Sequence, residues 1–299
     1  MLEIRNVNKS YGERAVLQDV SFTVGRGRMT GFVGGNGAGK TTTMRIILGV
    51  LSADAGTVSL DGAPLTAADR RRFGYMPEER GLYPKMRVHE QLVYLARLHG
   101  FAPAAAKRNA TALLEQLGLG ERANDTVESL SLGNQQRAQI AAALVHEPEV
   151  LVLDEPFSGL DPMAVDVVLG VLQSHAASGA PVLFSSHQLD IVERLCDDLV
   201  IIADGRIRAN DSTDALRKQH GSSRYEILLG GGEGGTGDAG WLREVAGVSV
   251  IDFDGGYALF EAGDEARAAV LERAVASGQL ASFGPHEPSL AQVFREVIR

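Results

Sequence analysis

From residue 34 to residue 42 the chain reads Gly34-Gly35-Asn36-Gly37-Ala38-Gly39-Lys40-Thr41-Thr42, and residues 34–41 fit the pattern G-x-x-x-x-G-K-[ST]. Glycines let the backbone curl so that several N–H groups point at one anionic ligand. An apolar segment, residues 30–33, precedes this run, and an apolar-faced segment, residues 41–48, follows it. Strand, loop and helix therefore stand in the order of a phosphate-binding loop. We expect residues 34–42, with the ammonium of Lys40, to hold the phosphates of a nucleotide at a helix N-terminus.

A second stretch places two acids where they would meet that loop. Residues 150–153 form the apolar run Val-Leu-Val-Leu, and Asp154 and Glu155 follow it directly. A continuous apolar run is typical of a parallel strand buried on both faces, and ligands bind at the carboxyl ends of such strands. We expect Asp154, with the hydroxyl of Thr41, to hold Mg²⁺, and Glu155 to act as the general base on the attacking water.

A third stretch, Leu130-Ser131-Leu132-Gly133-Asn134-Gln135-Gln136, lies about 20 residues before this strand. Taken together, the three stretches resemble the ABC-type ATPases, in which this third motif is the signature. The resemblance implies an α/β phosphate-loop domain with a RecA-like parallel sheet, an N-terminal antiparallel β subdomain and a helical signature subdomain. It further implies ATP as the nucleotide, with Ser131 and Gly133 reaching the γ-phosphate held by a second subunit.

The resemblance extends to three smaller pieces of sequence. Tyr11 matches the aromatic residue that stacks on adenine. The run Ser158-Gly159-Leu160-Asp161 matches the D-loop, so Asp161 is expected to help position the opposite site. His187, after an apolar strand at residues 182–184, matches the switch histidine that contacts the γ-phosphate, and we count it with Glu155 and Lys40 as catalytic.

Two places depart from the family pattern. Glu78 stands where the family usually has glutamine, and its carboxylate is expected to offer oxygen to Mg²⁺ or to water. In the signature, Leu132 and Asn134 replace a glycine and a glutamine. With the run of residues 80–84, Arg-Gly-Leu-Tyr-Pro, these departures are similar to those of export ATPases of the sodium-efflux type.

Composition and length indicate two domains and exclude several classes. The chain has 299 residues, of which 44% are hydrophobic and 22% charged, as in ordinary globular proteins. We expect an ATPase domain at residues 1–219, with its helical subdomain at about residues 86–147, and an accessory domain at residues 220–299. The formal charge of −9 argues against a general nucleic-acid binder. No apolar run reaches the length of a spanning helix, and the first residues lack a signal peptide's apolar stretch, so any membrane role is expected to come through a partner.

The C-terminal part changes in composition at about residue 220. Strands are expected at residues 225–229, 248–253, 257–261 and 280–283, and helices at residues 239–245 and 265–276. This order is typical of a ferredoxin-like βαββαβ unit, with a last helix at residues 288–298 as a cap. The glycine-rich run of residues 230–237 is expected to be a loop inside this α+β domain.

Other reactive or charged side chains receive structural interpretations. Cys196, the only cysteine, is expected to be a small buried apolar residue. The three arginines at residues 70–72 are expected to form a solvated helix face. Four histidines are expected to be surface or structural residues: His89, His99, His146 and His286.

The resemblance also implies partners and a location. Two copies are expected to stack head to tail with ATP between them, and a separately encoded integral membrane permease is expected to receive the motion. The protein would then work in the cytoplasm, on the inner face of the cell membrane. Two other interpretations stay open: a soluble ABC ATPase acting on ribosomes or DNA, and a nucleotide-dependent module that does not hydrolyse ATP.

Overall fold

The structure, a computed structural model, describes residues 1–79, 81–221, 223–230 and 237–298. Its contacts divide the chain into two compact units, Met1–Thr213 with Phe294–Arg299 and Asp214–Val293. Each unit has an apolar cluster of its own.

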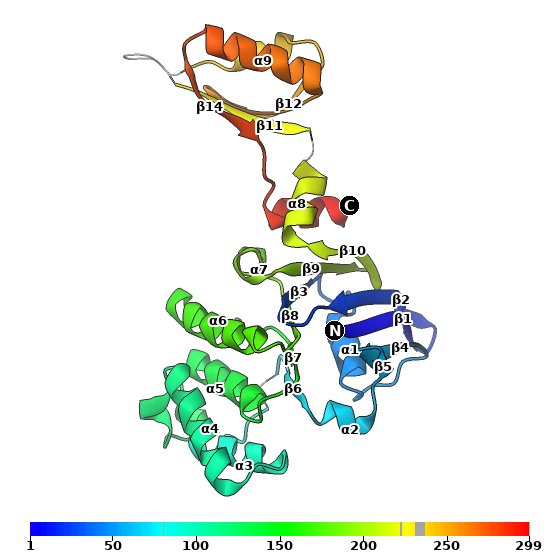
Figure 1. Ribbon diagram of the computed structural model, residues 1–299, viewed down its shortest axis with the longest axis vertical. Coiled ribbons are helices and arrows are strands. Elements are labelled where there is room, and N and C mark those ends of the chain that lie inside the picture. The colour runs from blue at the N-terminus through cyan, green and yellow to red at the C-terminus, as the bar shows by residue number, and fades with distance from the viewer. Residues whose placement is uncertain (80, 222, 231–236, 299) are drawn as a thin grey trace. The chain divides into compact units, whose positions relative to one another are not determined.

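An antiparallel sheet opens the larger unit (Figure 1). In spatial order its strands are β2 (Arg14–Val24), β1 (Leu2–Tyr11), β4 (Ala55–Leu60) and β5 (Ala63–Pro64). Alternation of apolar and polar residues predicts the first two strands, and β1 and β2 confirm that prediction.

The central sheet carries the order β10-β9-β3-β8-β7-β6, and all its neighbouring pairs are parallel except β10 with β9. Its strands are β3 (Met29–Val33), β6 (Phe73–Met76), β7 (Val150–Leu153), β8 (Val182–Ser186), β9 (Asp198–Ala203) and β10 (Arg206–Ser212). Every residue of β3, β7 and β8 is buried, as their continuous apolar runs predict. The phosphate-loop ATPase fold expected from the motifs is therefore present.

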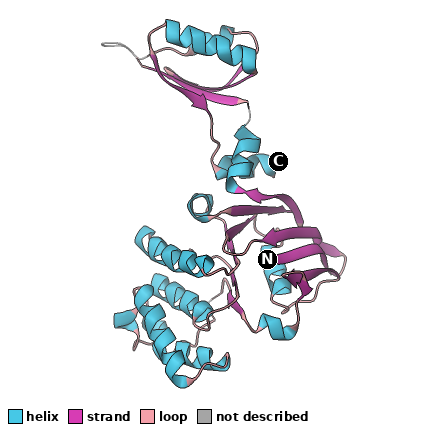
Figure 2. Ribbon diagram, viewed as in Figure 1, coloured by secondary structure: helices cyan, strands magenta, loops and turns pink. Residues whose placement is uncertain are grey.

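Between β6 and β7 the described chain is mostly helical, as the cyan ribbons of Figure 2 show, with one isolated β-bridge between Arg87 and Thr126. This segment contains α3 (Val88–Leu98), α4 (Pro103–Gln116), the short 3-10 turns η1 (Gly120–Arg122) and η2 (Val127–Ser129), and α5 (Leu132–Leu144). The chain before residue 213 also contains the helices α1 (Lys40–Ile47), α2 (Ala67–Arg70), α6 (Pro162–Ala177) and α7 (Leu189–Leu195). Since α6 joins the parallel strands β7 and β8, the predicted crossover unit is also present.

One apolar cluster packs α1 against both sheets. Met44 and Ile47 of α1 share this cluster with residues of β1, β2 and β3. The rings of Phe22 and Phe32 lie 5.1 Å apart between their centroids. Burial of this apolar face fixes α1, and with it the loop that precedes the helix.

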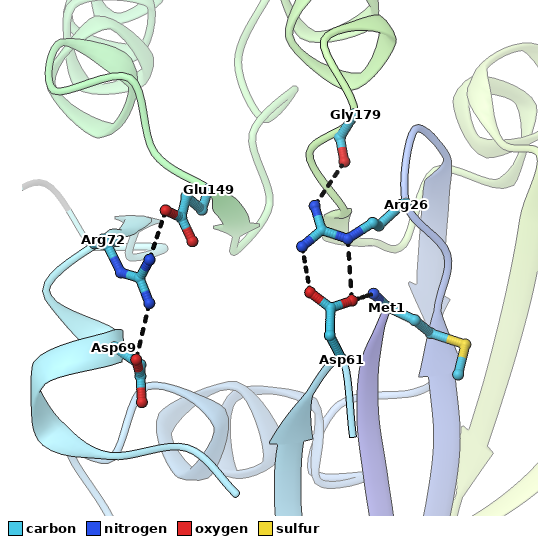
Figure 3. A network of polar contacts seen from close by, with 7 residues as sticks. All are labelled: Met1, Arg26, Asp61, Asp69, Arg72, Glu149 and Gly179. Carbon is cyan, nitrogen blue, oxygen red and sulfur yellow. Dashed lines mark hydrogen bonds and ion pairs between the residues drawn. The ribbon is translucent and has the colours of Figure 1, made fainter. Parts of the chain in front are cut away.

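Ionic contacts join segments of the larger unit that are distant in sequence, and separate hydrogen bonds of Arg70 correct the prediction for the arginine run. Asp61 lies between the Met1 amino group and the Arg26 guanidinium, while Arg72 lies between Asp69 and Glu149 (Figure 3). Arg70, expected in solvent, is instead half-buried.

Arg70 donates to the backbone oxygen of Ile47 at 3.0 Å and to that of Leu65 at 3.3 Å. The reason is that the last carbonyls of α1 have no partner within their own helix, and a guanidinium supplies donors to them.

The smaller unit is an antiparallel sheet of order β12-β13-β11-β14. The elements from residue 213 onward are α8 (Thr213–Gly221), β11 (Arg224–Leu229), η3 (Gly240–Glu244), β12 (Val248–Asp254), β13 (Tyr257–Ala262), α9 (Asp264–Ala276), β14 (Leu280–Pro285) and α10 (Leu290–Val297). This order fits the predicted ferredoxin-like unit, because β13 lies between β11 and β12, and β11 lies between β13 and β14. Of the predicted glycine loop, residues 231–236 lie outside the described residues.

The helix predicted at residues 239–245 is wrong. Only the 3-10 turn η3 forms there, because the segment is too short to nucleate an α-helix by itself and contains Gly240. Asp238 Oδ1 accepts a hydrogen bond from Gly240 N at 2.7 Å and so begins the turn.

Candidate functional site

The phosphate loop has the conformation that its glycines permit. Gly37 and Gly39 adopt positive φ angles of 76° and 109°, which other residues rarely reach. A Cβ atom on Gly39 would come within 2.5 Å of Leu17 Cδ2, so β2 leaves no room for a side chain there. Gly39 is also the N-cap of α1, and the free N–H groups of the first turn therefore open onto the loop.

The ammonium of Lys40 is hydrogen-bonded to the backbone of the loop that precedes it. Lys40 Nζ donates to the backbone oxygen of Gly34 at 2.7 Å and to that of Gly35 at 3.2 Å. The positive charge is thus held over the curl of the loop, where phosphate oxygens would be bound.

Asp154 is buried at the end of β7, and both of its carboxylate oxygens accept hydrogen bonds. Thr41 Oγ1 donates to Asp154 Oδ2 at 2.9 Å, and Ser185 Oγ donates to Asp154 Oδ1 at 2.6 Å. Ser185 Oγ in turn accepts from the backbone N–H of Glu155 at 2.9 Å. Ser185 therefore connects the two acids, and this role follows from the pairing of β7 with β8.

Glu155 occupies a strained backbone conformation beside His187. Its φ angle is +52°, in a region that costs about 1–3 kcal/mol for a non-glycine residue. Its carboxylate lies 2.9 Å from His187 Nδ1. The side chain of Glu155 is 11% exposed and that of His187 is 60% exposed, so a largely buried acid contacts a histidine that is open to solvent.

These groups line a single cavity of about 640 Å³. Its walls bring together most of the residues that the sequence predicts as a site: Tyr11, Asn36, Gly37, Ala38, Gly39, Lys40, Thr41, Thr42, Glu78, Asp154, Glu155 and His187. Arg14 and Val16 also line it and were not predicted. Their position in β2, directly after the hairpin that carries Tyr11, is the signal that could have found them.

Five predicted residues are not among those that line the cavity. Gly34 and Gly35 begin the loop, and their backbone oxygens accept the hydrogen bonds of Lys40 Nζ. Ser131 is the N-cap of α5, and its hydroxyl accepts from Asn134 N at 3.3 Å. Gly133 lies in the first turn of the same helix, and Asp161 caps α6 by accepting from Ala164 N at 2.8 Å.

The charge in the cavity is mixed. Lys40 and Arg14 bring positive charge, while Glu78, Asp154 and Glu155 bring negative charge. Burial, with Asp154 as the next cause, raises the pKa of the neighbouring Tyr75 phenol. A triphosphate beside three carboxylates needs additional positive charge, and a divalent cation is the usual source.

A parallel sheet whose carboxyl edge carries a glycine-rich phosphate loop, with paired acids on a neighbouring strand, defines a phosphate-loop nucleotide-binding protein. Residues 17–158 match the family described as ABC transporter, and residues 212–298 match the family described as ATP-binding protein DrrA1-3-like, C-terminal domain. The chain is 36% identical over its whole length, and over 98% of the relative, to the uncharacterized ABC transporter ATP-binding protein YhaQ of Bacillus subtilis. It therefore belongs to the ABC transporter ATP-binding protein family, and it is an ATPase.

Two further similarities agree with this assignment. The chain is 41% identical, over 72% of each sequence, to the Nod factor export ATP-binding protein I of Burkholderia orbicola. A solved structure described as the ATP-binding subunit of an ABC transporter superimposes with a TM-score of 0.68 at 37% identity, covering 74% of this chain and 93% of that one. No helix in the described ranges combines the length and apolar character that crossing a bilayer requires.

Proposed function

We propose that this chain is the ATP-hydrolysing subunit of an export-type ABC transporter, working as a head-to-tail pair that drives a separately encoded membrane permease. The observation that carries the proposal is the arrangement of Glu155 beside His187 and of Asp154 beside Thr41 around one cavity with Lys40. Relatives named for export support the direction of transport.

The donors in the cavity suit magnesium. Thr41, Asp154 and Glu78 offer a hydroxyl and carboxylate oxygens, which are the hard ligands that Mg²⁺ prefers. When bound, the ion neutralises charge that develops on the transferred phosphoryl group. Lys40 and the N–H groups of residues 36–42 would bind the phosphates, and Tyr11, which is exposed on the same cavity, would stack on adenine.

Hydrolysis in this proposal depends on Glu155 and His187. The largely buried carboxylate of Glu155 accepts a proton from the attacking water, and its strained backbone aims it into the cavity. His187 orients that carboxylate through the 2.9 Å contact and offers its exposed edge to the γ-phosphate. Each side chain thus has a separate task in the same step.

The cavity lacks the signature, and a second copy would supply it. Ser131 and Gly133 begin α5, and neither belongs to the cavity of its own chain. A Cβ atom on Gly133 would lie 3.5 Å from the backbone oxygen of Gly159, so the signature and the D-loop form one surface. We propose that this surface, with Asp161, closes on the γ-phosphate held by the partner, and that the pair has two-fold symmetry.

The permease would dock beside Glu78. A groove of about 240 Å³ is lined by Leu82, Pro84, Val127, Glu128, Gln135 and Gln139. Tyr83, with 60% of its surface exposed, lies on the same loop and is held by Gln91 Oε1, which accepts from Tyr83 N at 2.7 Å. A cytoplasmic helix of the permease would contact this groove of mixed apolar and polar character, and would place the protein on the inner face of the cell membrane.

Cross-linking tests the docking site directly. Cys196, the only cysteine, is buried, so a Tyr83→Cys substitution provides a single accessible thiol. Cross-linking of this variant to a co-expressed permease from the same operon is the expected result. If no permease is ever captured from position 83, the placement is wrong.

The smaller unit is proposed to be an accessory domain that contacts either the twin chain or the permease. The division into residues 1–219 and 220–299 stays a prediction. A soluble role on ribosomes or DNA remains the second candidate, and reconstitution separates the two, since only the transporter subunit gains ATPase activity from a permease.

Mixing two inactive variants tests the shared site. Ser131→Arg should retain ATP binding and lose hydrolysis, whereas Lys40→Ala removes the cation from the phosphate loop. In a mixed pair, one site combines the intact loop of the first chain with the intact signature of the second. Mixing should then restore about a quarter of wild-type activity, because half of the pairs are mixed and each has one complete site. Mixtures that stay as inactive as the separate variants would refute the shared site.

A further inference from the structure

A buried glutamine on the signature helix is bonded to the backbone at the proposed catalytic base. Gln136 belongs to α5 and is 5% exposed. Its Nε2 donates to the backbone oxygen of Glu155 and to that of Pro156, at 3.0 Å each. Both protons of the amide are therefore used on the strained segment that aims Glu155 into the cavity.

A second buried glutamine, one turn further along α5, makes the equivalent pair of contacts to the other acidic loop. Gln139 is 4% exposed, and its Nε2 donates to Pro77 O at 2.7 Å and to Glu79 O at 3.3 Å. These two carbonyls stand on either side of Glu78. Gln139 thus holds the backbone immediately before and after the residue proposed to meet Mg²⁺.

The hydrogen bonds of Gln139 Nε2 explain why the amide keeps an orientation that leaves its oxygen without a partner among the described residues. Its Oε1 is buried and finds no hydrogen-bond partner among the described residues. An unsatisfied buried acceptor costs about 1–3 kcal/mol. Turning the amide over would set that oxygen against two carbonyl oxygens, so the bonds to the Glu78 loop fix the orientation.

We propose that Gln136 and Gln139 are positioning residues that fix the loops of Glu155 and Glu78 to the signature helix. Since α5 is a single helix capped by Ser131, a shift of its N-terminus moves both glutamines. The inference rests on the proposed function, in which Ser131 meets the partner's ATP. Occupation of the partner's site then adjusts the base and the metal-facing acid of this chain together, which couples the two sites.

Methionine substitutions test the two bonds, because methionine keeps the length of glutamine and removes the amide donor. Gln136→Met should lower kcat about tenfold or more, with KM for ATP within about twofold of wild type, because a misplaced base affects the chemical step. Gln139→Met should raise the Mg²⁺ concentration that half-saturates binding of a fluorescent ATP analogue by about tenfold. Binding of the analogue in EDTA should stay within about twofold.

Matched controls separate positioning from stability. Gln173→Met, at an exposed glutamine of α6, should behave as wild type in every assay. Gln136→Leu and Gln139→Leu also remove the amide donors without adding charge, and they serve as a second pair where a methionine variant melts early. The expected defects follow the lost donor and not the melting temperature.

The outcomes distinguish this inference from the function beneath it. If wild type hydrolyses ATP and Glu155→Gln does not, while all four variants match Gln173→Met, the positioning role is refuted and the proposed function stands. If kcat and EDTA binding fall only in proportion to lost folded protein, the positioning role is equally refuted. Failure of mixed Ser131→Arg and Lys40→Ala chains to regain activity would instead overturn the shared site.

Discussion

His187 Nδ1 lies 2.9 Å from a carboxylate oxygen of Glu155 at the edge of the nucleotide cavity. The contact joins the ends of two neighbouring parallel strands, β7 and β8, so the sheet itself sets the distance between the histidine and the acid. The mostly buried acid is suited to accept a proton from water. The mostly exposed histidine is suited to contact a phosphate.

Removing either side chain should abolish turnover without abolishing binding. Glu155→Gln and His187→Ala should each lower kcat by about 10²-fold or more, because proton transfer and orientation in the transition state are lost. Binding of a fluorescent ATP analogue should change little. Glu115→Gln, at an exposed position of α4, is the matched control and should keep wild-type rates. Full activity in Glu155→Gln would exclude that residue as the base.

Exchanging Glu78 for the usual family residue should be tolerated. Glu78→Gln removes one negative charge from a cavity that already holds two other carboxylates, and keeps an oxygen donor at the same place. Hydrolysis should continue, and the affinity for Mg-ATP should rise or stay nearly constant, as measured by calorimetry or steady-state kinetics. An ATPase rate that falls to background would show that the charge itself is required.

Local motifs place most of the candidate site residues around one cavity, because each motif fixes its own local structure. The strands β7 and β8 end directly before Asp154 and His187, and parallel pairing brings both ends to one edge. The phosphate loop is similarly local, since its glycines and the following helix are contiguous in sequence. These parts of the site needed no knowledge of long-range contacts.

Residues that act through pairing between distant segments were not predicted. Ser185 reaches Asp154 only because β7 and β8 align in register, and nothing in its own sequence marks it. The strand β6 is four residues long and becomes a strand by pairing with β7. The two bridging glutamines of α5 belong to the same category, because their partners are 19 to 62 residues away.

The ionic contact at Asp61 should contribute little to the free energy of unfolding at neutral pH and nothing in strong acid (Figure 3). Its hydrogen bond with Arg26, followed by that with the N-terminal ammonium, holds the pKa of the Asp61 carboxyl well below its usual range. An acid whose pKa is lower in the folded protein stabilises the fold when the pH is above the pKa of the unfolded chain. This stabilisation is lost as the pH falls toward the pKa of the folded protein. Because the partners are about half exposed, Asp61→Asn should cost less than about 1 kcal/mol at pH 7.

Two conditions should remove the difference in stability between the Asp61→Asn variant and the wild-type protein. Molar salt screens exposed charges, and strong acid protonates Asp61 in the folded state. Thermal melts at low salt, at high salt and across the acid range measure both effects. A difference that persists unchanged in molar salt would show that packing, not charge, is responsible.

His146 should make the larger unit sensitive to mild acid. Its ring stacks on that of His99 with 3.7 Å between centroids, and its Nε2 lies 3.1 Å from the backbone oxygen of Phe73. Burial, followed by the charge of His99, lowers the pKa of His146 to about 4, and burial also lowers the pKa of His175.

A histidine with a lowered folded pKa binds fewer protons in the native state than in the unfolded chain. Stability is therefore complete above the unfolded pKa of about 6.5 and falls as the pH drops toward 4, by about 1.4 kcal/mol per pH unit for each such proton. His146→Phe keeps an aromatic ring against His99 and removes that proton. Its melting temperature should fall less than that of wild type between pH 7 and about pH 4.5, the remaining slope arising from His175 and the carboxylates. His89→Phe, on the helix that ends beside His99, should keep the wild-type slope, and equal slopes in the His146→Phe and wild-type proteins would exclude His146 as the source.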